Sequence, residues 1–212
     1  MVKKNTCIFI SGNGTNLKAL IKSSREYNFP INIRCIVSST KKANGLRFAK
    51  MYNIPYFIFS VNNHLNLELL LQKLKKNNIT FICLAGYLKI LKNNFINRFN
   101  GKIINIHPSL LPKYKGLDTF KRVLKSKEKI TGCTVHYVNT KLDSGQKILQ
   151  KKISIDLQDS EKSLKKRVQQ VEYKLMLKLL LSYSDKLIFK KKIDFYFSIF
   201  YGIRAVNRIF IY

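Results

Sequence analysis

Apolar and polar positions follow two different periods along the chain. Short runs rich in Ile, Val, Phe and Cys, such as residues 6–10 and 102–106, predict buried strands, whereas longer segments with apolar residues three and four apart predict amphipathic helices. Because the two kinds of segment alternate, we expect a doubly wound α/β fold with a mostly parallel sheet and antiparallel edge strands from the later part of the chain. The predicted strands are 6–11, 33–38, 56–59, 80–85, 102–107, 132–138 and 146–152, and the predicted helices are 16–26, 43–52, 64–77, 118–126 and 160–182.

The first predicted strand ends in a glycine-rich loop, which reads Ser-Gly-Asn-Gly-Thr-Asn from residue 11 to residue 16. Gly14 lets backbone N–H groups approach an anion, and the start of the following helix adds partial positive charge. Thr15 and Asn16 add side-chain hydrogen bonds. The loop therefore predicts a phosphate site. We do not expect a nicotinamide dinucleotide, because Leu17 occupies the third glycine position of G-x-G-x-x-G.

The strongest candidate for catalysis is the segment Asn-Ile-His-Pro-Ser-Leu-Leu-Pro at residues 105–112, followed by Asp143. Asn105 and His107 are two apart on a predicted strand, so their side chains share a face. An Asn amide can donate to a carbonyl oxygen as it becomes tetrahedral, and a carboxylate beside an imidazole favours its protonated form. We therefore predict that Asn105, His107 and Asp143 act on one carbonyl, with protonated His107 stabilising the oxyanion.

Composition sets limits on the function. The chain has 212 residues with 46% hydrophobic content, enough to bury one core, so one domain is expected. The net charge of +29 would normally indicate a nucleic-acid partner. However, the lysines are spread along every segment, so we interpret the charge as compositional drift and expect anionic small-molecule substrates instead of nucleic acid.

The cysteines and histidines indicate neither disulfides nor a metal site. Each of the four cysteines falls in a predicted strand, which is typical of buried, reduced thiols in a cytoplasmic protein. The three histidines are too scattered to form a metal site, so no metal is expected. The N-terminus leads directly into a core strand without an apolar targeting segment, and no segment resembles a membrane span.

Taken with the loop at residues 11–17 and Leu-Asp-Ser-Gly at 142–145, the segment 105–112 resembles the single-domain, folate-dependent phosphoribosylglycinamide formyltransferases. The resemblance covers roughly residues 6–190. It implies a formyltransferase fold with a Rossmann-like N-terminal half. It also implies transfer of the formyl group of 10-formyltetrahydrofolate to the amine of glycinamide ribonucleotide, a step of purine (IMP) biosynthesis.

The resemblance also assigns binding residues. On the helix predicted at 160–182, Gln169 and Glu172 are three apart and share a face. The residues implied for glycinamide ribonucleotide are Gly14, Thr15, Asn16, Gln169 and Glu172. Those implied for 10-formyltetrahydrofolate are Leu88, Lys89, Ile90, Leu91 and Asn105, with the loop 139–143 beside them.

The domain boundaries follow from the extent of the resemblance. We expect one formyltransferase domain at 1–190, with a nucleotide-binding half at about 1–100 and a folate and catalytic half at about 101–190. Residues 191–212 form an apolar aromatic tail of unknown role, which could cover a surface or mediate a homodimer.

The chain departs from the family pattern at several positions. Asn63 and His64 stand where Arg often meets the folate tail, and Lys141 replaces an acid. Lys115 stands where Pro is usual, which predicts a looser loop, and Ser144 replaces the first Gly of an Asp-Gly-Gly pattern. These substitutions bear on details of binding more than on the reaction.

Three alternatives remain open at the level of sequence. Methionyl-tRNA formyltransferase shares the Asn-x-His-Pro core and would explain the positive charge, but it needs a further tRNA-binding domain. Formyltetrahydrofolate hydrolase would carry an extra N-terminal domain. An inactive relic that binds folate or nucleotide would leave the catalytic candidates unused.

Overall fold

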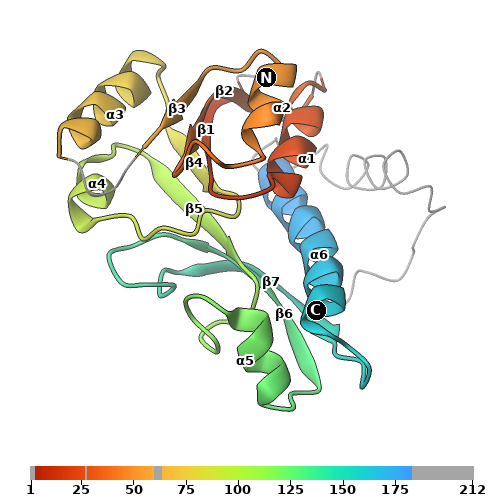
Figure 1. Ribbon diagram of the computed structural model, residues 1–212. Helices are drawn as coiled ribbons and strands as arrows, with labels where there is room; N and C mark the ends of the chain where they lie inside the picture. The colour runs from red at the N-terminus through yellow and green to blue at the C-terminus, as the bar shows by residue number, and fades with distance from the viewer. Residues whose placement is uncertain (1–2, 27, 60–63, 183–212) are drawn as a thin grey trace.

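A seven-stranded sheet organises the chain in the computed structural model, which describes residues 3–26, 28–59 and 64–182 (Figure 1). The strand order is β3-β2-β1-β4-β5-β6-β7. The strands are β1 Lys4–Ile10, β2 Ile31–Ser38, β3 Tyr56–Ile58, β4 Phe81–Leu84, β5 Lys102–His107, β6 Ile130–Tyr137 and β7 Lys147–Ser154. Neighbours from β3 to β5 pair in parallel, whereas β5–β6 and β6–β7 are antiparallel. The predicted fold class is confirmed.

Helices cover both faces of the sheet and produce two apolar cores. They are α1 Thr15–Ser24, α2 Leu46–Met51, α3 His64–Lys76, α4 Asn93–Arg98, α5 Thr119–Lys125 and α6 Glu161–Ser182. One core contains buried residues of α1, α2, α5 and α6, and the other contains those of α3 and α4. Because both faces are covered, the central strands β1 and β4 are almost entirely buried.

Within the described residues, the sequence predicted every strand and five of the six helices. It missed α4, which has six residues and buries only Phe95. So short a helix displays no apolar period, and its position depends on Phe95 packing near Phe9 and Phe99 in the second core. The four cysteines are free and buried, as expected. Among the described residues, no helix has the length and apolar content needed to cross a membrane.

The topology determines where a site can form. From β1 the chain moves outward to β2 and β3, and then returns on the other side of β1 as β4. The carboxyl ends of β1 and β4 therefore mark the reversal point of the sheet, where ligands of such folds bind. The loop after β1 and the segment after β4 begin at this point, and β5 is the next strand in the sheet.

Candidate active site

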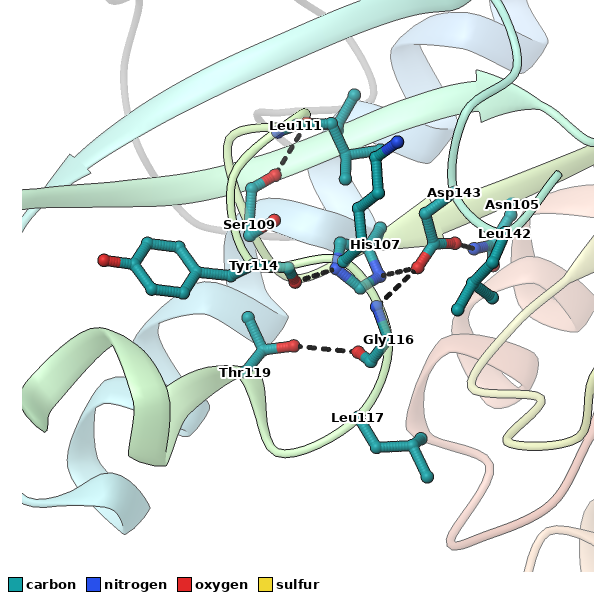
Figure 2. Close-up of polar contacts among 12 residues, drawn as sticks. Asn105, His107, Ser109, Leu111, Tyr114, Gly116, Leu117, Thr119, Leu142 and Asp143 are labelled. Atoms are coloured by element: carbon teal, nitrogen blue, oxygen red, sulfur yellow. Dashed lines mark hydrogen bonds and ion pairs between the residues drawn. The ribbon is translucent and has the colours of Figure 1, made fainter. Parts of the chain in front are cut away.

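Asn105, His107 and Asp143 lie together at the end of β5, as predicted (Figure 2). The amide Nδ2 of Asn105 donates to Asp143 Oδ1 over 3.4 Å, and His107 Nδ1 lies 3.3 Å from Asp143 Oδ2. Asp143 comes from the loop between β6 and β7 and reaches both side chains because they share one face of β5. His107 and Asp143 are buried, whereas Asn105 is half-buried. One carboxylate thus connects an amide and an imidazole.

The Asp143 carboxylate is held in its ionised form. Burial raises its pKa, but hydrogen bonding with His136, a bond of 2.8 Å from the Gly116 backbone N–H and the nearby His107 outweigh this and lower the pKa to about 2. The backbone of Asp143 is left-handed, with φ of 45°. Two residues later, a Cβ on Gly145 would lie 1.7 Å from the carbonyl oxygen of Tyr137, so only glycine permits this close turn.

The sequence predicted a protonated His107, and the structure indicates a different protonation state. Burial lowers the pKa of this imidazole, and this outweighs the opposing effect of Asp143, so the ring is neutral at pH 7 in the free protein. Nevertheless, both ring nitrogens face acceptors, since Nε2 lies 2.8 Å from the Tyr114 carbonyl oxygen and Nδ1 faces Asp143. Nε2 is closer to its acceptor than Nδ1 is, so the single ring proton of the neutral imidazole lies on Nε2. Nδ1 is then a base whose protonated form would find a carboxylate already in place.

His136 is a member of the site that the sequence reasoning missed. It lies on β6 directly opposite Asn105, and it is 2% exposed. Its Nδ1 donates to the Tyr137 carbonyl oxygen over 2.8 Å, which leaves Nε2 to accept from the Asn105 amide over 3.3 Å. Nε2 also lies 3.6 Å from Asp143 Oδ1. His136 therefore fixes the orientation of the Asn105 amide, and the antiparallel register between β5 and β6 was the signal that could have identified it.

The glycine loop leaves the N-terminus of α1 open. Gly14 precedes α1 with φ of 72°, and no side chain caps the first turn. Thr15 is exposed at the first helical position, so the first N–H groups of α1 are available to an anion. Gly14 has a second reason to be glycine, because a Cβ there would lie 2.6 Å from the Cα of Gly45. Gly45, which precedes α2, was not recognised in the sequence.

Asn16 and Glu172 form a second polar pair beside this helix end. Asn16 Nδ2 donates to Glu172 Oε2 over 3.2 Å, and Glu172 is buried. Burial raises the pKa of the carboxyl to about 7, against smaller lowering effects of Asn16 and Lys165. Gln169 lies one turn earlier on α6 and is half-buried. The predicted nucleotide residues Asn16 and Glu172 are thus in contact.

The segment after β4 presents an apolar surface. Leu88 and Ile90 are 59% and 66% exposed, whereas Leu91 is buried in the second core. Lys89 is also exposed. The Leu88 backbone N–H donates to Ser11 Oγ over 2.9 Å, which ties this segment to the glycine loop. Two large exposed apolar side chains near the reversal point of the sheet suit a flat heterocycle, while Leu91 can contribute only through its backbone.

Two positions where the chain departs from the family pattern contact each other. Lys115 Nζ donates to Ser144 Oγ over 2.5 Å and so connects the loop after β5 to the loop that carries Asp143. Lys141 is exposed, and its backbone N–H donates to Asn139 Oδ1. Asn63 and the tail 191–212 lie outside the described residues. Within the described part of the chain, no cluster of three or more His, Cys, Asp or Glu side chains could hold a metal ion.

Comparison with known proteins identifies the family of this chain. The family model described as formyl transferase matches residues 4–180. The chain is 39% identical to phosphoribosylglycinamide formyltransferase of Haemophilus influenzae, over 81% of this chain and 83% of that protein. It is 33% identical to phosphoribosylglycinamide formyltransferase of Bacillus subtilis, over 81% of this chain and 90% of the relative.

A solved structure gives the same result. Glycinamide ribonucleotide transformylase 1 from Geobacillus kaustophilus superimposes with a TM-score of 0.80 at 32% identity, covering 86% of this chain and 100% of that one. The sequence match and the structural match both extend over most of this chain. The chain therefore belongs to the formyl transferase family, and within that family to the phosphoribosylglycinamide formyltransferases.

Proposed function

We propose that this enzyme transfers the formyl group of 10-formyltetrahydrofolate to the primary amine of glycinamide ribonucleotide, a step of purine biosynthesis. The observation that carries the proposal is the buried, ionised Asp143, which touches both an amide and a neutral imidazole at the end of β5. That arrangement suits acyl transfer, in which an oxyanion forms and a proton must move. The free, buried cysteines suit the cytoplasm, where thiols stay reduced.

The reaction needs one proton to be moved. The amine nitrogen attacks the formyl carbon, the π electrons of the carbonyl move onto oxygen, and the bond from carbon to N10 of the folate then breaks. The amine loses a proton and N10 gains one. Asp143 Oδ2, which faces His107 Nδ1 over 3.3 Å, relays the amine proton to this neutral nitrogen and then from it to N10, directly or through a water. No covalent bond to the enzyme is needed.

Asp143 and Asn105 stabilise the charges that develop. When His107 takes up the proton, Nδ1–H gains a charged acceptor in Asp143, and the 3.3 Å separation shortens. The two Asn105 contacts, 3.3 Å to His136 and 3.4 Å to Asp143, are long, so one N–H can turn to the formyl oxygen as it becomes negative. His107 thus becomes positive next to the developing oxyanion.

We assign the two substrates to the two sides of the group formed by Asn105, His107 and Asp143. The phosphate of the nucleotide binds the open N-terminus of α1 at Gly14 and Thr15. Asn16 and Glu172, with Gln169 one turn away, bind the ribose and the amine side of the same molecule. On the other side, the pterin of 10-formyltetrahydrofolate binds the backbone of Leu88 to Leu91 next to the exposed Leu88 and Ile90, with Lys89 in the same segment.

The test is a formyl-transfer assay with purified protein, 10-formyltetrahydrofolate and glycinamide ribonucleotide. We expect nucleotide-dependent turnover that falls about 100- to 10,000-fold in Asp143→Asn, since both the imidazolium and the amide lose their charged partner. Asp156→Asn is the matched control, because it makes the same change at an exposed carboxylate on the loop before α6. It should retain full turnover.

Assays with other formyl acceptors distinguish the alternative functions. Turnover only with methionyl-tRNA, or release of free formate without any acceptor, would contradict the named reaction while leaving the family assignment intact. If the wild-type protein binds both substrates but transfers nothing, the chain is an inactive relic. Equal turnover of wild type and Asp143→Asn would contradict the assignment of the site.

A further inference from the structure

The loop of residues 113–118, between β5 and α5, has an unfavourable backbone. Tyr114, Gly116 and Asp118 have φ values of 57°, 80° and 53°, so three of these residues are left-handed and only one of them is glycine. A left-handed conformation is unfavourable for a non-glycine residue, because its Cβ lies too close to the following carbonyl oxygen. Contacts with the rest of the protein must therefore keep the loop in this shape.

On its inner side, this loop touches both members of the proton-transfer pair (Figure 2). The Tyr114 carbonyl oxygen lies 2.8 Å from His107 Nε2, and the Gly116 N–H donates to Asp143 Oδ2 over 2.8 Å. The first contact selects which ring nitrogen carries the proton, and the second helps to hold the carboxylate ionised. A displacement of the loop would therefore disturb the tautomer and the carboxylate together.

On its outer side, the same loop is held by one cation. Arg122, on α5, donates from Nη1 to the Lys115 carbonyl oxygen over 2.6 Å and to the Leu117 carbonyl oxygen over 3.2 Å. Its guanidinium also lies 5.6 Å from the centre of the Tyr114 ring. The 115–116 peptide thus connects the two sides of the loop, since its Gly116 N–H donates to Asp143 and its Lys115 carbonyl accepts from Arg122. The Tyr114 carbonyl also faces the catalytic pair, and the Leu117 carbonyl also faces Arg122.

Other contacts hold different parts of the loop. Thr119 Oγ1 donates to the Gly116 carbonyl oxygen over 3.2 Å, and Glu128 accepts from the hydroxyl of Tyr114 over 2.9 Å. Glu128 restrains a side chain and leaves the peptides free to rotate. Arg122 restrains the 115–116 peptide, whose N–H is the Gly116 donor to Asp143, and also the 117–118 peptide. Bonds from a charged donor are roughly twice as strong as neutral ones.

We infer that Arg122 is a positioning residue for the formyl transfer, and that it acts through the Lys115 and Leu117 carbonyls to hold Tyr114 and Gly116 against His107 and Asp143. The inference rests on the proposed function. Arg122 touches neither substrate nor reacting atom in this assignment, so its loss should lower kcat and leave the KM for glycinamide ribonucleotide unchanged.

The kinetic test compares Arg122→Gln and Arg122→Lys with Lys121→Gln. Lys121 is the neighbouring exposed cation on α5, so its replacement removes the same charge and spares the loop. We expect kcat to fall about 10-fold or more in Arg122→Gln, since displacements of about 1 Å can cost 100-fold. Arg122→Lys keeps the charge but loses the planar guanidinium that places Nη1 between the two carbonyl oxygens, and should be nearly as slow. A fully active Lys variant, or an equally slow Lys121→Gln, would overturn the inference.

A second readout does not need activity. Exchange of the Gly116 amide proton, followed by NMR, reports directly on its bond to Asp143. In both Arg122 variants the Gly116 amide proton should exchange at least about 10-fold faster than in the wild type. Amide protons of β5, such as that of Ile104, should keep their wild-type exchange rates. Unchanged exchange at Gly116 would refute the positioning role. If the wild type shows no turnover with glycinamide ribonucleotide, the proposed function fails, but the exchange result still decides what Arg122 holds.

Discussion

Glu172 offers a quantitative test of the nucleotide side of the site, through the stability of the free protein. Its carboxyl is 7% exposed, and its pKa of about 7 lies well above the ordinary 4.5 because of burial. The folded state thus prefers the protonated form. The stability contributed by this preference is complete below pH 4.5 and is lost as the pH rises through 7. At higher pH the fold must hold a buried charge with one amide donor, Asn16.

The size of the effect follows from the two pKa values. A rise from 4.5 to about 7 makes the ionised group about 3 kcal/mol less stable in the fold than in the unfolded chain. Between pH 5 and pH 8, about 2.5 kcal/mol of this penalty develops. Glu172→Gln has nearly the same shape and keeps an acceptor for Asn16, but it cannot ionise. We therefore expect the variant to gain about 2.5 kcal/mol relative to the wild type over this range.

The assay is urea unfolding of wild type and Glu172→Gln at pH 5, 6.5 and 8. Only the difference between the two proteins is used, because the effects of other titrating groups then cancel. Glu161→Gln serves as a control for the same substitution at an exposed position of the same helix. If the difference between wild type and Glu172→Gln stays constant from pH 5 to pH 8, the carboxyl is not titrating in the fold and the reasoning is wrong.

Two further predictions concern other buried groups. Because the pKa of His107 is lowered below 6.5 and its neutral form is the proposed base, kcat/KM should fall on the acid side with a midpoint below pH 6.5, and a midpoint above 6.5 would contradict this role. The hydroxyl of Tyr87 is buried without a hydrogen-bond partner among the described residues, so Tyr87→Phe should raise the free energy of unfolding by about 1 kcal/mol in urea melts; a loss of stability would show that the hydroxyl is bonded.

The sequence predicted the fold and the central residues because both depend on local signals. Apolar runs identified all seven strands, and a spacing of two positions placed Asn105 and His107 on one face. Asp143 was recognised from its motif. What the sequence could not provide was the degree of burial. Burial reversed the expected effect of Asp143 on the pKa of His107, and it depends on how the chain packs around the ring.

Two other residues escaped prediction for different physical reasons. His136 enters the site through the antiparallel register of β6 with β5, which depends on how the whole connection through α5 returns the chain to the sheet and not on residues near His136. Arg122 acts through backbone carbonyls, and a carbonyl oxygen is present at every residue, so the sequence around it carries no pattern. Interactions of side chains with backbone are generally harder to read from sequence than interactions between two side chains.

The chain has eleven acidic residues, and two of the buried ones are shifted in opposite directions. Asp143 faces a backbone N–H and two imidazoles, which lower its pKa to about 2, whereas Glu172 has a single amide donor and a pKa of about 7. Asp143 therefore stays charged near neutral pH, which suits its proposed role of stabilising an imidazolium. The charge of Glu172 depends on what binds. A cationic or hydrogen-bond-donating ligand would favour its ionised form, so nucleotide binding near neutral pH should release a proton from this carboxyl.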